Sequence, residues 1–391
     1  MSSSPRSGAD SCPGALRVHQ AADGGLARVR LPGGELDAAR FAVLADACAE
    51  LGDGALELTS RGNVQIRGLA PGAEVELGER LRAGGLLPSA SHETVRNIAA
   101  SVLSGRDGRG LVDVRPLVSA LDAGLCADPE LAGLSGRFLF VVDDGRGDVI
   151  AMRGDVGLYA VGADEFALVL GGSDTGVRVG GEDAVGVALR AARAFLAVRD
   201  GEWRLTEWSD PVGRLAGLLP EASAEVIEVP RVPAKPALGV VEQVDGRFAL
   251  HGIVPFGRLE PGPLRDAPGL VVTPWRTVVI TDLTDVSHSH GLVTGSGSSW
   301  DGLTACAGRP GCAKSLTDVR ADAARARAAS GAGLPVHWSG CDRQCGRPAS
   351  AHVAVVATAD GYQVRRGDQV RAPGHDLTAT AAAVARARES E

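Results

Sequence analysis

Four cysteines in the last quarter of the chain have a spacing that could bind an inorganic centre. The stretch "TACAGRPGC" holds Cys306 and Cys312, and "SGCDRQCG" holds Cys341 and Cys345. Four thiolates can hold a tetrahedral zinc ion or an iron–sulfur cluster. Zinc sites favour shorter spacings than C-x5-C, whereas a cubane is wider and its irons can be reached by separate ligands. The spacing therefore favours a [4Fe-4S] cluster, with zinc or unliganded thiols as alternatives.

The composition limits the possible partners. The 391 residues carry a formal net charge of -8 without any block of basic residues, which argues against nucleic acid or an anionic membrane. No apolar run reaches about 18 residues, and the N-terminus lacks the pattern of a signal peptide. Seven cysteines, an odd number, do not suggest a disulfide framework. We expect a cytoplasmic protein that acts on a small molecule and has a disordered tail over residues 1–13.

The elements that position the cysteines belong to an internal repeat. Residues 56–69, "LELTSRGNVQIRGL", match residues 270–283, "LVVTPWRTVVITDL", at a constant offset of 214. Apolar residues alternate on both sides of a threonine-containing turn in each copy. This pattern predicts a pair of strands with one buried face.

Upstream segments extend the repeat. "LPGGELD" at 31–37 resembles "VPFGRLE" at 254–260. The first copy continues into a predicted helix over 37–51, capped by Asp37 and ended by Gly52. The second copy has room only for a short helical turn.

Downstream segments repeat as well. Residues 110–125 and 315–329 share an Asp-Val-Arg triplet that enters an alanine-rich helix, and strand-like runs follow at 137–145 and 351–361. The proline-bearing stretch 218–239 joins the two halves. The chain therefore reads as two tandem halves, each with a small and a larger α/β module. Two such halves about a pseudo-twofold axis create an interface, where pockets are common.

The cysteine pattern, the duplicated strand pair and the alternation of small and large modules together resemble the sirohaem-type nitrite and sulfite reductase superfamily over nearly all of residues 15–370. The resemblance implies a duplicated α+β fold with two ferredoxin-like half-domains and two larger α+β domains. It also implies that the four cysteines bind a [4Fe-4S] cluster, and that Cys345 bridges to sirohaem where sirohaem is present. The implied division of the chain is a tail (1–13), half-domain 1 (14–88), α+β domain 1 (89–210), a linker (211–236), half-domain 2 (237–286) and the cluster-binding α+β domain 2 (287–385).

The resemblance also assigns basic residues to an anionic tetrapyrrole. The arginine of "TSRGNVQI" is Arg61, and that of "VRNIAAS" is Arg96. The reductases have the sequence Leu-Pro-Arg-Lys-Phe-Lys at the segment where this chain has "LSGRFL". Arg137 therefore replaces the first active-site lysine, and Leu139 replaces the second. Reduction of nitrite or sulfite needs repeated proton delivery, which a lysine can assist and a leucine cannot.

Two further arginines complete the predicted set of tetrapyrrole contacts. Arg276 lies in the repeated strand pair, and Arg309 lies beside the cysteines. Arginine forks suit carboxylates because two parallel charge-assisted hydrogen bonds fix the orientation of the bound group.

Within the superfamily, the short chain and its "PFGRLE"-like elements resemble the precorrin-3B synthase family of aerobic cobalamin biosynthesis. That resemblance implies oxygen-dependent hydroxylation of precorrin-3A at C-20 with γ-lactone formation, a [4Fe-4S] cluster and a separate non-haem iron. A sirohaem-dependent sulfite or nitrite reductase is the alternative. A third possibility is an electron-transfer or zinc-stabilised protein without catalysis of its own.

The ligands of such an iron and the source of electrons are not evident from the sequence. His288 and His290 form the most ligand-like histidine pair, and His337 precedes Cys341 by four residues, but the pattern assigns none of them. No G-x-G-x-x-G follows a strand, so we expect an external electron donor, a ferredoxin or an NADH-linked reductase.

Overall fold

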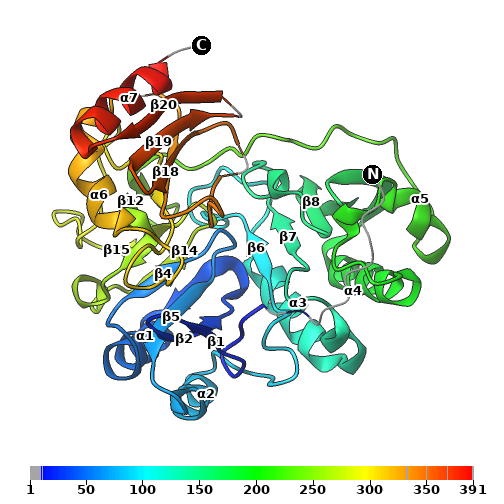
Figure 1. Ribbon diagram of the computed structural model, residues 1–391. Helices are drawn as coiled ribbons and strands as arrows, with labels where there is room; N and C mark the ends of the chain where they lie inside the picture. The colour runs from blue at the N-terminus through cyan, green and yellow to red at the C-terminus, as the bar shows by residue number, and fades with distance from the viewer. Residues whose placement is uncertain (1–9, 11, 332, 349, 368, 390–391) are drawn as a thin grey trace.

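The computed structural model describes residues 10, 12–331, 333–348, 350–367 and 369–389. Their strands form four five-stranded sheets of two kinds, and each kind occurs twice (Figure 1). The predicted internal duplication is therefore confirmed. None of the described helices is long and apolar enough to cross a bilayer.

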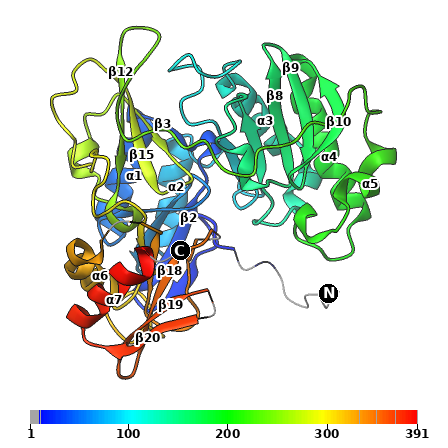
Figure 2. The ribbon, with the colours of Figure 1, turned by 90° about the horizontal axis from the view of Figure 1, so that it is seen from above.

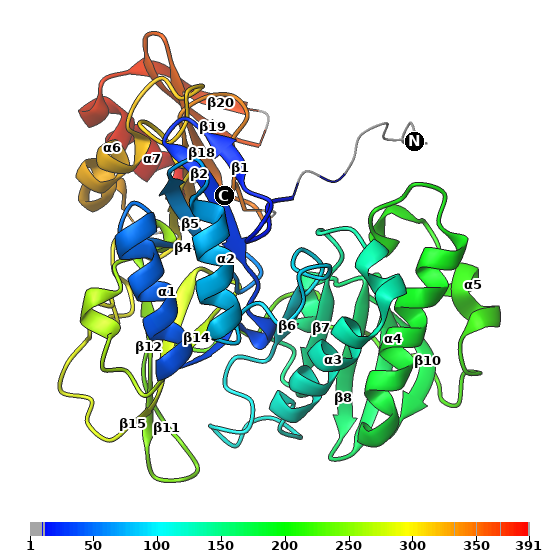
Figure 3. The ribbon, with the colours of Figure 1, turned by 90° about the horizontal axis from the view of Figure 1, so that it is seen from below.

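The first small module is a sheet covered by two helices (Figure 3). Asp37 caps the first helix by accepting a 2.7 Å hydrogen bond from the Arg40 amide, and Gly52 ends it, as the sequence predicts. Its own elements are β1 (His19–Ala21), β2 (Gly24–Val29), α1 (Ala38–Leu51), β4 (Leu56–Leu58), β5 (Val64–Leu69) and α2 (Ala73–Ala83).

The second small module repeats the sheet without the long helix. A 3₁₀ turn at Gly262–Leu264 replaces α1 because nine fewer residues connect the same two positions. Its own strands are β11 (Gly239–Glu242), β12 (Phe248–Ile253), β14 (Gly269–Val272) and β15 (Thr277–Leu283).

The two small modules exchange one edge strand each. The strand β3 (Glu35–Asp37) pairs with β14 of the other half, and β13 (Arg258–Leu259) pairs with β4. Leu36 lies opposite Leu270, and Leu259 lies opposite Leu56, which are equivalent pairs in the repeat. The two sheets consequently share one apolar core.

The two larger modules have the same strand order and directions. In each, two parallel pairs precede two antiparallel pairs, with helices packed on the sheet (Figures 1 and 3). The first contains β6 (Ile98–Ala100), α3 (Arg115–Ala127), β7 (Phe140–Asp143), β8 (Val156–Gly162), β9 (Glu165–Leu170), β10 (Ser173–Val179) and α4 (Gly181–Val198). The second contains β16 (Leu303–Ala305), α6 (Val319–Ala326), β17 (Val336–Ser339), β18 (Val353–Thr358), β19 (Gly361–Arg366), β20 (Gln369–His375) and α7 (Leu377–Glu389).

An extended segment joins the two halves. The short helices α5 (Pro211–Leu215) and Ala216–Leu218 occupy the first part of the predicted linker 211–236, and residues 219–238 then cross the molecule without helix or strand (Figure 2). Val229 of this segment packs on the sheet of the first larger module. The remaining 3₁₀ turns are Pro32–Gly34, Pro129–Gly133, Ile150–Met152, Leu205–Glu207, Pro255–Gly257 and Arg327–Ser330.

Candidate functional site

The two cysteine-bearing loops leave neighbouring parallel strands at the same edge of a sheet. The loop with Cys306 follows β16, and the loop with Cys341 follows β17. The amide of Gly340 donates to the Cys306 sulfur over 3.3 Å, so the two loops are in direct contact. Gly340 is required at this point because a Cβ atom there would lie 1.8 Å from the Ser315 hydroxyl oxygen.

The four thiols share a partly exposed environment. Cys306, Cys312 and Cys341 are half-buried, and Cys345 is exposed. Burial raises the pKa of Cys306, and the Cys345 and Cys312 thiols contribute a smaller shift in the same direction. A peptide N–H that points at a cysteine sulfur is the kind of contact that tunes an iron–sulfur cluster.

The four thiols supply the donor atoms of a possible metal centre. In the part of the chain that the structure describes, no three His, Cys, Asp or Glu side chains converge closely enough to hold one metal ion. A cubane distributes its four ligands over separate irons, whereas tetrahedral zinc draws four ligands to one ion. The thiols on these two adjoining loops are the type of donor that a [4Fe-4S] cluster uses.

The first half carries other residues at the positions of these cysteines. The Ser101 amide donates to Val142 over 3.1 Å, and the Cys306 amide donates to Trp338 over 2.9 Å. The amides two residues before the Asp-Val-Arg triplets also donate to the facing loops. The Leu111 amide donates to the Asp144 carbonyl over 2.8 Å, and the Leu316 amide donates to the Gly340 carbonyl over 2.9 Å. At this constant offset of 205, Ser101 is equivalent to Cys306, and Asp107 is equivalent to Cys312.

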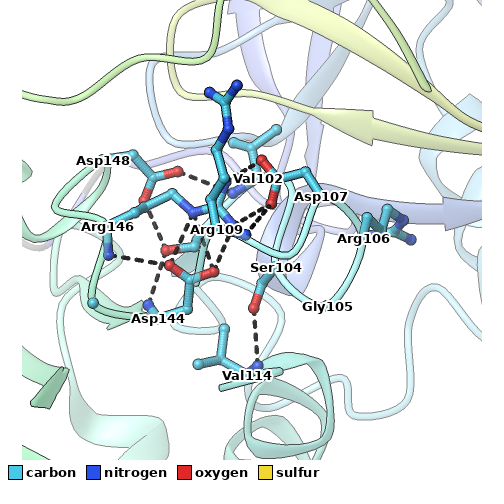
Figure 4. A network of polar contacts seen from close by, with 12 residues as sticks. Val102, Ser104, Gly105, Arg106, Asp107, Arg109, Val114, Asp144, Arg146 and Asp148 are labelled. Atoms are coloured by element: carbon cyan, nitrogen blue, oxygen red, sulfur yellow. Dashed lines mark hydrogen bonds and ion pairs between the residues drawn. The ribbon is translucent and has the colours of Figure 1, made fainter. Parts of the chain in front are cut away.

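A polar network joins the two equivalent loops of the first half (Figure 4). The Ser101 hydroxyl donates to Asp148 over 2.7 Å, and Arg146 forms ion pairs with both Asp107 and Asp144 at 2.9 and 2.8 Å. Asp144 and Asp148 are fully buried. Charged side chains thus connect the two loops of the first half that are equivalent to the cysteine-bearing loops of the second half.

A basic cavity of about 440 Å³ lies in the first half. Three arginines line it: Arg28, Arg61 and Arg137. Burial and the nearby charge of Arg204 lower the pKa of Arg61 to about 10. The three guanidinium groups give this cavity an excess of positive charge, which favours an anionic ligand.

A fourth arginine lies behind the cavity wall. Arg30 is 2% exposed and donates only to backbone carbonyls, those of Thr94 (3.1 Å) and Pro13 (3.4 Å). Burial and the charge of Arg28 lower its pKa to about 9. Neither Arg28 nor Arg30 was predicted as a site residue, although Arg28 lies on β2 and Arg30 directly follows it, so that their i, i+2 spacing favours one face.

The predicted tail contributes to the same cavity. Cys12 and Pro13 line it, and the Asp10 carboxylate accepts hydrogen bonds from the Ser135 hydroxyl (3.0 Å) and the Gly136 amide (2.5 Å). Residues 1–9 and 11 lie outside the described part. Residues 10, 12 and 13 therefore pack on the folded domain, whereas the sequence suggested disorder up to residue 13.

The five predicted arginines occupy three different environments. Arg61 and Arg137 share the cavity, and Arg137 stacks over the Trp203 ring at 4.9 Å. Arg276 lies near the second cysteine loop, at 3.5 Å from the Gly346 carbonyl, and Arg309 in the first loop donates to the Ser315 carbonyl over 2.8 Å.

Arg96 lies elsewhere. Arg96 is 4% exposed, and its side chain forms a bidentate pair with Asp122 at 2.7 and 2.6 Å, together with a 3.2 Å bond to the Leu86 carbonyl. These contacts engage all three guanidinium nitrogens, and Arg96 does not line the cavity. In this structure it holds α3 against the segment before β6.

Leu139 also lies away from the cavity. It is 3% exposed and packs with Ala99 and Val141 on the sheet of the first larger module. Of the two positions where the reductases carry lysines, one therefore presents a cation, Arg137, to the cavity, and the other is apolar.

The histidines do not form a second metal site among the described residues. His288 is exposed, and His290 is partly exposed. His337 is fully buried, and its Nδ1 lies 2.9 Å from the Thr304 hydroxyl oxygen. Burial, and then the charges of Arg276 and His352, lower its pKa to about 4, so its imidazole is neutral at pH 7.

Comparisons with known proteins agree with this arrangement. A family model described as the nitrite/sulfite reductase ferredoxin-like half domain matches residues 19–84. A precorrin-3B synthase from Sinorhizobium sp is 30% identical over 384 residues, which cover 90% of this chain and 81% of that protein. A ferredoxin–nitrite reductase from Synechococcus elongatus is 28% identical over 403 residues and covers 88% and 78% of the two chains.

The fold has a solved counterpart. The Mycobacterium tuberculosis NirA protein superposes with a TM-score of 0.68 over 94% of this chain and 79% of its own, at 19% identity. That likeness confirms the predicted fold class. Together, the strand-exchanged duplication and the similarity over nine-tenths of its length identify the chain as a member of the nitrite and sulfite reductase superfamily.

Proposed function

We propose that the protein is an oxygen-dependent monooxygenase of the precorrin-3B synthase type, which hydroxylates precorrin-3A at C-20 and forms the γ-lactone. The observation that carries this proposal is the contrast between Arg137, which lines the arginine cavity, and Leu139, which is buried in an apolar layer two residues later. The cavity keeps the charge needed to hold a carboxylate-rich tetrapyrrole. At position 139, where the reductases carry their second lysine to assist repeated protonation of a small oxyanion, this chain has the buried Leu139.

The arginines of the cavity would bind and orient the substrate. Arg61 and Arg137 approach from different segments of the chain, so two acetate or propionate groups of one macrocycle could be held at once. Each guanidinium can donate two parallel hydrogen bonds to a carboxylate, which fixes orientation as well as position. Arg28 adds a third charge, and its Nε donates to the Gln65 amide oxygen over 3.0 Å when that amide is oriented toward it.

The four cysteines would hold a [4Fe-4S] cluster. When bound, such a cluster supplies single electrons. Hydroxylation consumes one O₂, two electrons and two protons, and places one oxygen atom in the product and one in water. The electrons would come from a ferredoxin or an NADH-linked reductase, since the sequence contains no dinucleotide-binding motif.

A separate non-haem iron has no ligand set among the described residues. We therefore assign no step of the reaction to it. The second candidate function, a sirohaem-dependent nitrite or sulfite reductase, is favoured by the similarity to the Synechococcus elongatus enzyme, which is nearly as high as that to the synthase.

One assay separates the two candidates. The anaerobically purified protein is supplied with precorrin-3A, ¹⁸O₂ and a reductant, and the product is analysed by mass spectrometry. One added ¹⁸O atom supports the synthase. An intense sirohaem spectrum together with turnover of nitrite or sulfite, and no labelled product, would overturn the proposal.

A further inference from the structure

The first cysteine loop is held from outside its own domain by one buried arginine. Arg67 on β5 donates to both oxygens of Asp23 at 2.9 Å, through Nε and Nη2, and Nη2 also donates to the Gly311 carbonyl over 2.9 Å. The Arg67 side chain is 8% exposed. Gly311 immediately precedes Cys312, so this contact fixes the backbone beside one of the four thiols.

The loop is shaped for this contact. A Cβ atom at Gly311 would lie 3.0 Å from Asp23 Oδ2 and 3.1 Å from the Arg67 terminal nitrogen, so any larger residue would displace the pair. Asp23 lies in the turn between β1 and β2, whereas Arg67 lies on β5. Two separate segments of the first small module therefore converge on this one carbonyl.

The other half shows which part of this contact is ordinary architecture. At the offset of 205, Arg106 is equivalent to Gly311, and its carbonyl accepts a 2.8 Å bond from the Val244 amide in the turn between β11 and β12. A contact between hairpin and loop thus belongs to the fold. In the cysteine-bearing half, the charged side chain of Arg67 makes this contact instead of a backbone amide. Asp23 holds that side chain in place through two hydrogen bonds.

We propose that Arg67, oriented by Asp23, is a positioning residue that fixes the Cys312 loop for the cluster. This inference rests on the cluster of the proposed function. A carbonyl held by a guanidinium cannot rotate away, so Cys312 keeps its place when its iron bond stretches or breaks. Residues that orient metal ligands commonly change metal affinity by about 10- to 100-fold when they are lost.

The test compares Arg67→Gln and Arg67→Lys with a matched control from the other half, Arg106→Gln. The Arg106 side chain is 7% exposed and forms a bidentate pair with Glu35 at 2.7 and 3.0 Å, remote in sequence from the four clustered cysteines. The Glu35 side chain is 34% exposed, against 18% for Asp23. Each full-length variant is reconstituted anaerobically, its iron and thermal midpoint are measured, and the rate of iron release to a chelator is followed. We expect Arg67→Gln to release iron roughly tenfold faster than wild type. Arg67→Lys should be intermediate because an ammonium cannot serve Asp23 and Gly311 as a fork does.

The control separates positioning from loss of stability. Arg106→Gln should lower the thermal midpoint by an amount similar to Arg67→Gln yet release iron at the wild-type rate. Equal release rates for Arg67→Gln and Arg106→Gln would overturn the inference.

A second measurement keeps this test distinct from that of the proposed function. In the iron-free full chain, the alkylation rate of Cys312 is measured by peptide mass spectrometry. Faster alkylation of Cys312 in Arg67→Gln than in Arg106→Gln supports the clamp even if wild type takes up no cluster, a result that would itself count against the proposed function. Equal alkylation in that case would overturn the clamp as well.

Discussion

The Ser101 hydroxyl donates to the Asp148 carboxylate over 2.7 Å at the position where the second half of the chain carries Cys306. The two halves therefore join the same pair of loops by different chemistry. The first uses hydrogen bonds and ion pairs among buried side chains. The second has thiols suited to a metal cluster.

The Asp148 carboxylate should make stability fall as the pH rises. Burial and the neighbouring Asp143 raise the pKa of Asp148 from 3.8 to about 7. A carboxyl that binds its proton more tightly in the folded state contributes stability that is complete below pH 3.8 and is lost as the pH rises through 7. In urea unfolding, we expect this group to lower the free energy of unfolding of the wild type by about 2 kcal/mol between pH 5.5 and 8.5. Asp148→Asn should remove this pH-dependent decrease. A slope unchanged by the substitution would contradict this assignment.

Substitution of Arg61 should weaken tetrapyrrole binding, whereas substitution of Arg96 should lower thermal stability. Arg61→Gln is expected to weaken tetrapyrrole binding by roughly 10- to 100-fold, the usual effect of losing a charge-assisted hydrogen bond, with little change in thermal midpoint. Arg96→Gln should lower the thermal midpoint because it leaves the Asp122 carboxylate without its partner. Binding titrations and thermal scans of both variants check the contrast, and a reversed pattern would exchange the two roles.

The buried charge of Arg30 should cost stability in the free protein. Among the described residues no carboxylate forms an ion pair with this guanidinium, and burial lowers its pKa to about 9. Arg30→Met keeps most of the side-chain volume and removes the charge, so we expect equal or higher thermal stability but weaker tetrapyrrole binding. A variant that binds as well as wild type would separate Arg30 from the cavity.

Cys345→Ser should remove the cluster. Cys345 is the exposed member of the set, and a serine hydroxyl is a poor substitute for thiolate. Iron and sulfide content, together with the broad absorbance of the cluster, should fall with activity. Cys126→Ser, a half-buried cysteine on α3, serves as the matched control and should retain all three. A full cubane in Cys345→Ser would show that another residue supplies the fourth ligand.

The duplicated strands could be predicted because their signal is local. Leu56, Leu58, Val64 and Ile66 alternate along the chain and bury one face, and the second copy repeats the pattern. The exchange of β3 and β13 could not be predicted, because each is only two or three residues long and its partner lies more than 200 residues away.

The arginines show the same limit at the candidate site. Their motifs indicated Arg61 and Arg96 equally, yet the structure places one in a cavity and pairs the other with Asp122. The pairing depends on where α3 packs, which no local pattern encodes. Arg28 and Arg30 could have been suspected from their spacing on a strand, but their charge matters only because the turn bearing Arg61 folds against them.

The exchanged edge strands have a consequence for the origin of the chain. A polypeptide with only one half would leave the outer edge of β4 or β14 unpaired, since the strand that covers it is encoded in the other half. Two copies of such a polypeptide could close both sheets by swapping that strand, as a symmetric homodimer. The present chain has the architecture of such a dimer joined through residues 219–238, and a single chain, unlike a homodimer, can carry four thiols in one half and Ser101 and Asp107 at equivalent positions in the other.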